Sequence, residues 1–541
     1  MPPRAAAARR RPLVAPATPL HRACRLSFYR RNGSGQGAWV GRLLVERGER
    51  VARTPQKSFA IDVAAVFFFV GVVIVGFGAA MLLPAVLDLI NGNADYAVFL
   101  TSAGIAVFTG LSLALACHRS RHSMGGREVT LAVPATWLSA TVVAALPFMF
   151  SQFGLSFVDA VFETMSGLTA TGSTVIVGLE GAPPGLLLWR FLLIWMGGFG
   201  VVTLMVLVLP FLRIGGQQLF TIDLSAQTGK ILPRATAVVL KVGVVYAALT
   251  FACAIAFRIE GMSGFDAVGH AMAAIATGGF SSHDSGIGFF RSPAIEWTAS
   301  IFMLLSALPF VLHTRIFERG PLVVFEDAQV ILFLAVTAAA AGAVTLWLMA
   351  RLDLDLLEAA RQATFNVVST ISTTGFTSQD YVQWGDFPLL VLLACMLVGG
   401  CTGSTAGGIK MFRLVILLRA VRAQIHRQIF PHVATTVTYN RQPVADQIRA
   451  GVGLYVFVYL STFLGFALAL GFAGLSFVES IGGSATALGG VGPGLGGAIG
   501  PCCTFSPLPD AAKWLLSVEM LAGRLEILVL VVPMTRTFWR S

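Results

Sequence analysis

The sequence predicts an all-α polytopic membrane protein, and three observations indicate this fold class. Hydrophobic residues form 56% of the 541-residue chain and charged residues only 12%, whereas soluble domains carry about 25% charged residues. Ten apolar runs, nine of them without a charged residue, predict bilayer-spanning helices, which need about 20 residues each. A segment that ends in glycine recurs four times along the chain. Together these features exclude an ordinary soluble protein.

Residues 1–58 form a basic N-terminal tail that we expect to be disordered and cytoplasmic. Residues 1–57 contain twelve Arg, one Lys and two acidic residues, so they carry the whole formal net charge of +11. A basic terminus of a membrane protein sets topology or contacts anionic lipid headgroups. A transit peptide is the alternative. Nucleic-acid binding would need basic residues spread over a folded face, so we expect no nucleic-acid partner.

The apolar runs predict five segments after the tail. Two accessory spans occupy residues 59–127, and four repeated units follow at 128–234, 235–320, 321–449 and 450–541. The runs are 63–87, 96–118, 129–158, 191–212, 242–257, 297–312, 328–350, 387–409, 450–478 and 511–535. Basic residues gather in alternate connecting loops, so the positive-inside rule places both termini in the cytoplasm.

The fourfold repeat is centred on Gly172, Gly279, Gly375 and Gly492. Each unit consists of one span, a short amphipathic helix, the glycine and a second span. Non-helical backbone at mid-membrane depth survives only when it is buried in protein or lines a water-filled cavity. Helix C-termini favour a cation, and glycine keeps side chains away so that carbonyl oxygens can line a path. Four such motifs predict four pseudo-symmetric units around one pore, although a single glycine of this kind more often serves packing.

A second motif interrupts the apolar run 387–409. Five glycines fall within residues 399–408, and each costs a helix about 1 kcal/mol relative to alanine. We expect the helix to break there, about halfway through the membrane and on the inner side of the four glycines. This is the one glycine-broken span in the sequence, and a Gly-rich packing face is the alternative.

Arg524 lies in the last apolar run, where a charge costs at least ~2.5 kcal/mol. It must face a cavity or a partner, and Glu519 and Glu526 are close to it in sequence. Lys410 follows the Gly-rich segment and either assists Arg524 or marks the inner membrane boundary.

The sequence contains no enzyme motif, so we expect no enzymatic activity. It has no HExxH, nucleophile elbow or phosphate-binding glycine loop, and its seven cysteines show no paired spacing. His270 aligns with Glu163 and Asn366 and is expected to pack as a polar residue, with metal ligation as the alternative. His283 and Asp284 are expected to form a solvated pair.

Six motifs stand out as a set: TATGS at 169–173, ATGGFSSHD at 276–284, STTGFTSQDY at 372–381, GGVGPG at 489–494, GGCTGSTAGGIK at 399–410 and AGRLEIL at 522–528. As a set they resemble the Trk/Ktr/HKT superfamily of potassium transporters, most closely the bacterial TrkH-type subunits. The resemblance covers about residues 59–541 and implies span, pore helix, filter and span repeats with two extra N-terminal spans. It implies that K+ passes a selectivity filter formed by Ala170, Thr171, Gly172, Thr277, Gly278, Gly279, Thr373, Thr374, Gly375, Gly490, Val491 and Gly492.

The resemblance also assigns selectivity and gating. Sodium-preferring members of the superfamily carry serine at the first filter glycine, so Gly172 implies potassium over sodium. Gly490 departs from the family pattern, because many relatives have a polar residue there. Arg524, with Lys410, would form an electrostatic barrier to cations. The intramembrane gate loop would comprise Gly399, Gly400, Thr402, Gly403, Ser404, Thr405, Gly407 and Gly408.

The resemblance therefore implies potassium uptake across a bacterial inner membrane, driven by the membrane potential alone or with H+ or Na+ coupling. It further implies a homodimer on a cytoplasmic TrkA-type regulatory subunit that binds NAD or ATP. Within this chain we expect K+ as the transported ion and no covalent cofactor, with membrane lipid as surroundings. A coupled secondary transporter of a small organic solute is the alternative, although that class pairs its interrupted helices within inverted halves. An intramembrane enzyme is a second, less favoured alternative.

Overall fold

The computed structural model describes residues 61–120, 124–207, 231–433 and 435–540, which are mostly helical. The predicted basic tail of residues 1–58 lies outside these residues. Seven described helices are long and apolar enough to cross a membrane. One further pair of helices, bent by 98° at a short break, passes the same test together.

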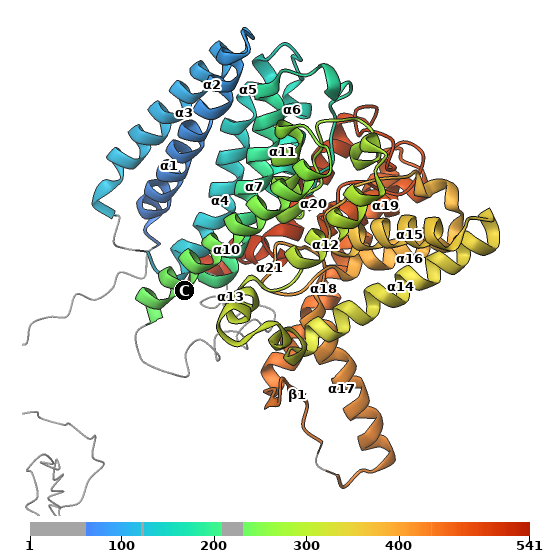
Figure 1. Cartoon of the computed structure of the whole chain (residues 1–541). Coiled ribbons are helices and arrows are strands. Elements are labelled where there is room, and N and C mark those ends of the chain that lie inside the picture. Colours follow the sequence, from blue (N-terminus) through green and yellow to red (C-terminus); the bar gives the residue numbers. More distant parts are fainter. Residues whose placement is uncertain (1–60, 121–123, 208–230, 434, 541) are drawn as a thin grey trace, which may run out of the picture. The chain divides into compact units, whose positions relative to one another are not determined.

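The first two spans pack closely against each other. α1 (Val63–Ala80) continues as α2 (Leu82–Ile90), and α3 (Tyr96–Ala116) returns beside them. A Cβ atom on Gly71 would lie 2.6 Å from the carbonyl oxygen of Gly110, so only glycine permits this approach of the two backbones. Figure 1 shows α1, α2 and α3 together on one side of the described chain.

Each of the four later segments contains a long helix, a short helix and a further helix or pair of helices. The first two segments contain α4 (Gly126–Ala144), α5 (Leu146–Phe150), α6 (Phe157–Leu168), α7 (Pro184–Leu207), α10 (Ile231–Ile259), α11 (Gly264–Ile275), α12 (Pro293–Ser306) and α13 (Phe310–Arg319). The third contains α14 (Ala328–Leu352), α15 (Leu356–Ile371), α16 (Asp386–Val398), α17 (Met411–Ile429), β1 (Thr438–Tyr439) and β2 (Gln442–Pro443). The fourth contains α18 (Asp446–Phe472), α19 (Phe477–Gly489), α20 (Asp510–Arg524), α21 (Ile527–Val531) and α22 (Arg536–Arg540). Short 3-10 turns lie at His118–Ser120, Leu179–Gly181, Gly286–Phe290, Pro321–Glu326, Tyr381–Trp384 and Val532–Met534.

Three of the four short helices, α6, α11 and α19, begin in the same way. A serine hydroxyl accepts a hydrogen bond from the backbone N–H three residues later, at 3.1 Å for Ser156 and 3.0 Å for Ser263. The acids that precede the repeated glycines by thirteen residues therefore stand at the third helical position, where the capping serine accepts from their N–H groups. α15 begins about one turn earlier, capped by Asp355, so the aligned Gln362 lies inside the helix.

The short helices pack between neighbouring segments in sequence order. α7 contacts α11, α12 contacts α15, α16 contacts α19, and α20 contacts α6. The later helix of each segment thus packs against the short helix of the next, and the fourth segment returns to the first. The largest hydrophobic cluster joins buried residues of the first two segments to the accessory spans.

Three of the ten apolar runs are interrupted by a sharp break. The sequence predicted only one of these breaks, at the five glycines of residues 399–408. α12 and α13 are separated at residues 307–309, where Pro309 lacks an N–H group and disfavours the helical conformation of the preceding residue. α16 ends before the Gly-rich segment. α20 and α21 are separated at Glu526, which adopts φ 66°. Among the described residues, the expectation of ten spans thus corresponds to seven spans that are straight enough to count as one helix and three runs with a sharper break.

Candidate functional site

Each short helix ends in a segment of the same conformation. The repeated glycines have positive φ, between 67° for Gly279 and 112° for Gly492, and so do the residues two positions before them. At those earlier positions Ala170, Thr277 and Thr373 adopt φ of 49–56°, a strained conformation for residues with a side chain. Gly490, the departure noted in the sequence, has φ 67° there and avoids this strain. We call residues 170–172, 277–279, 373–375 and 490–492 the first to fourth filter segments, after the role that the sequence resemblance predicts for them.

The middle residue of each filter segment is tied back to its own helix in one pattern. Its N–H donates to the carbonyl oxygen five residues earlier, at distances from 2.8 to 3.0 Å. The four pairs are Thr171 with Ser166, Gly278 with Ala273, Thr374 with Ser369, and Val491 with Thr486. The same geometry is therefore built four times from four different sequences.

The four glycines meet in one closed ring. A Cβ atom added to Gly172 would overlap the carbonyl oxygen of Gly278. The same addition at Gly279 would meet Thr374, and at Gly375 it would meet Val491. On Gly492 it would lie 2.8 Å from the carbonyl oxygen of Thr171. Each filter segment thus contacts the next, and the fourth contacts the first, so the twelve residues singled out in the sequence lie together.

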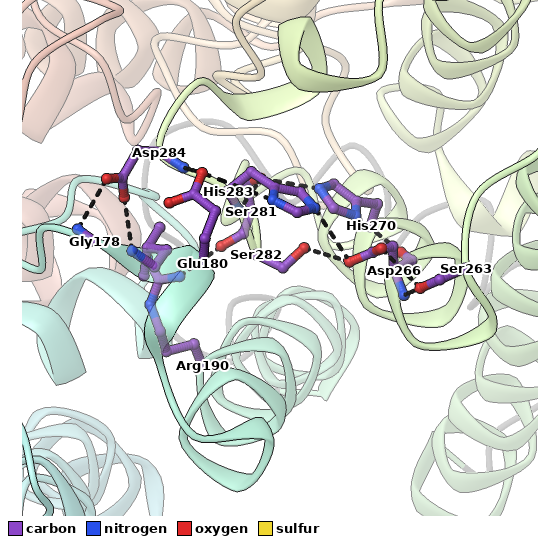
Figure 2. Close-up of polar contacts among 11 residues, drawn as sticks. Gly178, Glu180, Arg190, Ser263, Asp266, His270, Ser281, Ser282, His283 and Asp284 are labelled. Carbon is purple, nitrogen blue, oxygen red and sulfur yellow. Dashed lines mark hydrogen bonds and ion pairs between the residues drawn. The ribbon is translucent and has the colours of Figure 1, made fainter.

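The segment that follows the second filter segment is bound to the first repeat. Asp284 accepts hydrogen bonds from the backbone N–H groups of Gly178 and Leu179 at 2.8 and 2.9 Å. His283 lies between two carboxylates, 3.6 Å from Asp266 and 3.7 Å from Glu180 (Figure 2). Both residues therefore also link the first and second segments, with Asp284 exposed and His283 partly buried.

The neighbouring polar residues agree with a packing role for His270. Its Nδ1 lies 2.8 Å from the carbonyl oxygen of Asp266, and its Nε2 lies 3.0 Å from the hydroxyl of Ser281. Burial raises the pKa of the Asp266 carboxyl. Hydrogen bonds from Ser282 and Ser263 lower this pKa by more than burial raises it, so the carboxyl has a pKa below its ordinary value. No cluster of three or more His, Cys, Asp or Glu suited to a metal occurs among the described residues.

The Gly-rich loop, residues 399–408, lies against the inner ends of the short helices. The Thr405 hydroxyl donates to the carbonyl oxygen of Ile275, the last residue of α11, at 3.1 Å. The Gly407 N–H donates to the Thr373 hydroxyl at 2.8 Å, and a Cβ atom on Gly407 would overlap the backbone of Gly489 at the end of α19. The loop therefore touches the second, third and fourth repeats directly beneath the filter segments.

The remainder of the loop is fixed by neighbouring elements. Cys401 N–H donates to Ala307 at 3.1 Å, and the Gly403 carbonyl accepts from Phe310 at 2.8 Å. These two bonds join the loop to the break between α12 and α13. The other predicted loop residues are held as follows: Gly399 is packed on Gly407, Gly400 accepts from Met411, Thr402 donates to Gln329, Ser404 donates to Cys401, and Gly408 is packed on Gly399.

Arg524 points at this loop and not at a local acid. Its Nη1 donates to the carbonyl oxygen of Thr405 at 2.7 Å, while Nε and Nη2 have no hydrogen-bond partner among the described residues. Glu519 instead accepts from Ser484 at 2.6 Å, and Glu526 accepts from Arg413 at 2.7 Å. The alternative of a local ion pair for Arg524 was therefore wrong.

Lys410 is buried, which contradicts a role as a boundary residue at the membrane surface. Its Nζ lies 3.8 Å from the Glu526 carboxylate and 3.2 Å from the Met205 sulfur. Arg413, three residues after Lys410, is fully buried between Glu526 and the ring of Tyr455, 3.5 Å from its centroid. The sequence did not indicate this cluster, because a charge at the end of an apolar run was assigned to topology.

A second buried ion pair was also missed. Glu163 in α6 and Arg190 in α7 are 2.8 Å apart and almost completely buried. Glu163 was noted in the sequence only because it aligns with His270, and Arg190 stands just before an apolar run. The sequence signal that could have revealed this pair was the charge of Glu163 inside an otherwise apolar repeat.

Comparisons with known proteins give one consistent result. Residues 96–538 match the TrkH family, described as a cation transport protein. The chain is 37% identical to the Trk system potassium uptake protein TrkI of Halomonas elongata, over 85% of this chain and 94% of that protein. It is 33% identical to TrkH of Escherichia coli K12, over 88% of this chain and 99% of the relative. The structure is similar to the crystal structure of the potassium transporter TrkH from Vibrio parahaemolyticus, with TM-score 0.82 and 33% identity over 89% of this chain and all of that one.

Proposed function

Because the chain belongs to the TrkH family of cation transport proteins, we propose that it is a potassium uptake protein and not an enzyme. It is an integral membrane protein, since its relatives are transporters and seven of its helices are apolar and long enough to cross a bilayer. The transported ion is K+, in keeping with the names of the relatives.

The proposed selectivity filter consists of the four filter segments, and the closed ring of glycine and carbonyl contacts is the observation that carries this assignment. Backbone carbonyls replace the hydration shell of a monovalent ion in selective pores. The C-terminal ends of the four short helices add a negative potential. Gly172 at the first position supports potassium over sodium, as expected from the resemblance.

The Gly-rich loop is proposed to close the pore beneath the filter. Its contacts with Ile275, Thr373 and Gly489 support this, because they hold the loop against the ends of three of the four short helices. Arg524 is proposed as the electrostatic barrier, since its guanidinium keeps unpaired N–H groups beside the loop. Lys410 contributes less, because the Glu526 carboxylate lies near its charge.

The three interrupted runs are the feature that favours the alternative, a coupled transporter of a small organic solute. Such a site would require polar side chains to recognise the solute. The filter segments instead converge through their backbones, which favours a bare cation.

Energy input and assembly follow from the same proposal. The membrane potential supplies ~2.3 kcal/mol per charge per 100 mV, with H+ or Na+ coupling as an added source. We place the protein in a bacterial inner membrane with both termini cytoplasmic, as a homodimer. A TrkA-type NAD/ATP-binding subunit would contact α17 and the β1–β2 hairpin, which project beyond the other helices (Figure 1).

Potassium-limited growth tests the proposal. The full chain should rescue a strain that lacks its own uptake systems, and purified protein in vesicles should carry K+ and Rb+ faster than Na+. Gly172→Ser should reduce this preference. Rescue without ion discrimination, or equal discrimination in Gly172→Ser, would contradict the filter assignment.

A further inference from the structure

We propose that the buried ion pair of Arg190 and Glu163 is a positioning device for ion selectivity, which fixes the spacing between the first and second filter segments from behind. This inference rests on the proposed function, because it assigns the pair to that filter.

The pair lies where a charge is costly. Glu163 is 0% exposed and Arg190 is 1% exposed. A buried ion pair offsets the loss of hydration only when its geometry is good and its remaining polar atoms are also bonded. The 2.8 Å contact between Arg190 Nε and Glu163 Oε1 meets the first requirement.

The remaining bonds of Glu163 reach the first filter segment. Its Oε2 accepts from the backbone N–H of Val175 at 2.9 Å, and both carboxylate oxygens lie 3.0 Å from the Thr174 hydroxyl. These two residues are the second and third after Gly172. The carboxylate therefore fixes the chain where it leaves the first filter segment.

The remaining bonds of Arg190 reach the second filter segment. Its Nη1 donates to the carbonyl oxygen of Ser281 at 2.6 Å (Figure 2), and its guanidinium lies 4.1 Å from the centre of the Phe280 ring. These residues are the first and second after Gly279. One ion pair thus holds the exits of two adjacent filter segments.

This arrangement controls the distance between the two segments. Gly172 and Gly278 are the point where they touch, and their exits cannot separate without breaking the ion pair or its bonds to Val175 and Ser281. Selectivity depends on the placement or the field of the filter carbonyls. A loosened pair would therefore change ion preference before it changed the capacity to conduct.

The residues at the equivalent positions in the other three repeats make weaker contacts with the chain that follows their filter segments. Of the residues that follow the filter segments, His270 contacts the Ser281 hydroxyl, and Asn366 donates to the Ser378 hydroxyl at 3.2 Å; their other bonds stay within their own helices. Gly483, at the fourth equivalent position, has no side chain. Of these four equivalent positions, only Glu163 in the first repeat forms an ion pair with the helix that follows its short helix. We therefore expect selectivity to depend most on this quarter of the ring.

The test compares Arg190→Gln, Glu163→Gln and the double variant in vesicles containing the full chain. The measured quantities are the ratio of K+ to Na+ flux and the KM for K+. Each single variant should lower the flux ratio about tenfold, and the double variant should lose no more than the worse single one, because the two residues act as a unit. The double variant leaves no unpaired buried charge, so it provides the measurement if a single variant does not fold.

Lys513→Gln is the matched control. Lys513 in α20 pairs with Asp159 on the same short helix at 2.6 Å, but that pair has no bond to a filter segment. Its flux ratio should stay within about twofold of the starting protein, since an ion pair without filter contacts changes stability alone. An unchanged ratio in a folded Arg190 or Glu163 variant, or an equal loss in Lys513→Gln, would overturn the inference. A starting protein without K+ preference would instead overturn the proposed function.

Discussion

Arg524 donates a hydrogen bond from Nη1 to the carbonyl oxygen of Thr405 across 2.7 Å. This contact joins the last interrupted run to the Gly-rich loop. Only 5% of Arg524 is exposed, and its other two nitrogens have no hydrogen-bond partner among the described residues. Because Thr405 also contacts the end of α11, a positive charge lies beside the loop beneath the filter segments.

Removing this charge should increase ion flow. In Arg524→Gln we expect K+ flux into vesicles to rise about fivefold, since about 1 kcal/mol of repulsion is lost. Arg524→Lys keeps the charge and should stay near the original rate. Equal flux in both variants would show that the hydrogen bond to Thr405, and not the charge, is important.

The position of the Gly-rich loop should be sensitive to one methyl group. Gly407→Ala places a Cβ atom on the backbone of Gly489, so the loop must move and Rb+ leak should rise severalfold. Gly342→Ala, in α14, meets nothing within 4 Å and should leave the leak unchanged, with stability raised by up to about 1 kcal/mol. If Gly407→Ala shows no increase in Rb+ leak, the proposal that the loop is a gate is wrong.

The fourth filter segment should tolerate a side chain at one glycine and not at the other. The atom nearest to a Cβ on Gly490 would be the Thr171 hydroxyl oxygen at 4.0 Å, so Gly490→Ala should cost only the ~1–2 kcal/mol of its positive φ. The same change at Gly492 collides with Thr171 and should lower the K+ to Na+ flux ratio about tenfold. Similar ratios in the two variants would contradict the ring geometry.

The buried acid beneath the loop should be essential for stability. Glu526→Gln leaves Arg413 and Lys410 without their carboxylate, which costs about 3–5 kcal/mol for a buried pair. The thermal unfolding temperature in detergent should fall clearly. Glu318→Gln removes an exposed pair with Lys241 and should have almost no effect. If both variants unfold at the same temperature, the buried cluster does not stabilise the protein.

The repeated glycines could be predicted from the sequence because their geometry is local. Each short helix carries its own cap, such as Ser263, and its own turn, such as Thr277 with positive φ. Four copies of one local pattern are visible without any knowledge of long-range contacts. The Gly-rich break was predictable for the same reason.

Long-range partners were not predictable from one sequence. Glu526 was matched with Arg524, its neighbour in sequence, whereas it pairs with Arg413, 113 residues away. Glu163 and Arg190 are brought together by the packing of α6 on α7. The breaks at Pro309 and Glu526 lack a glycine cluster, so composition alone did not reveal them.

The most direct measurement of the central claim is a structure of the full chain with bound Tl+ or Rb+. Our account predicts ion density at the centre of the ring formed by Gly172, Gly279, Gly375 and Gly492, within coordination distance of backbone oxygens from all four filter segments. Ion density only outside this ring, or coordinated by side chains alone, would contradict it.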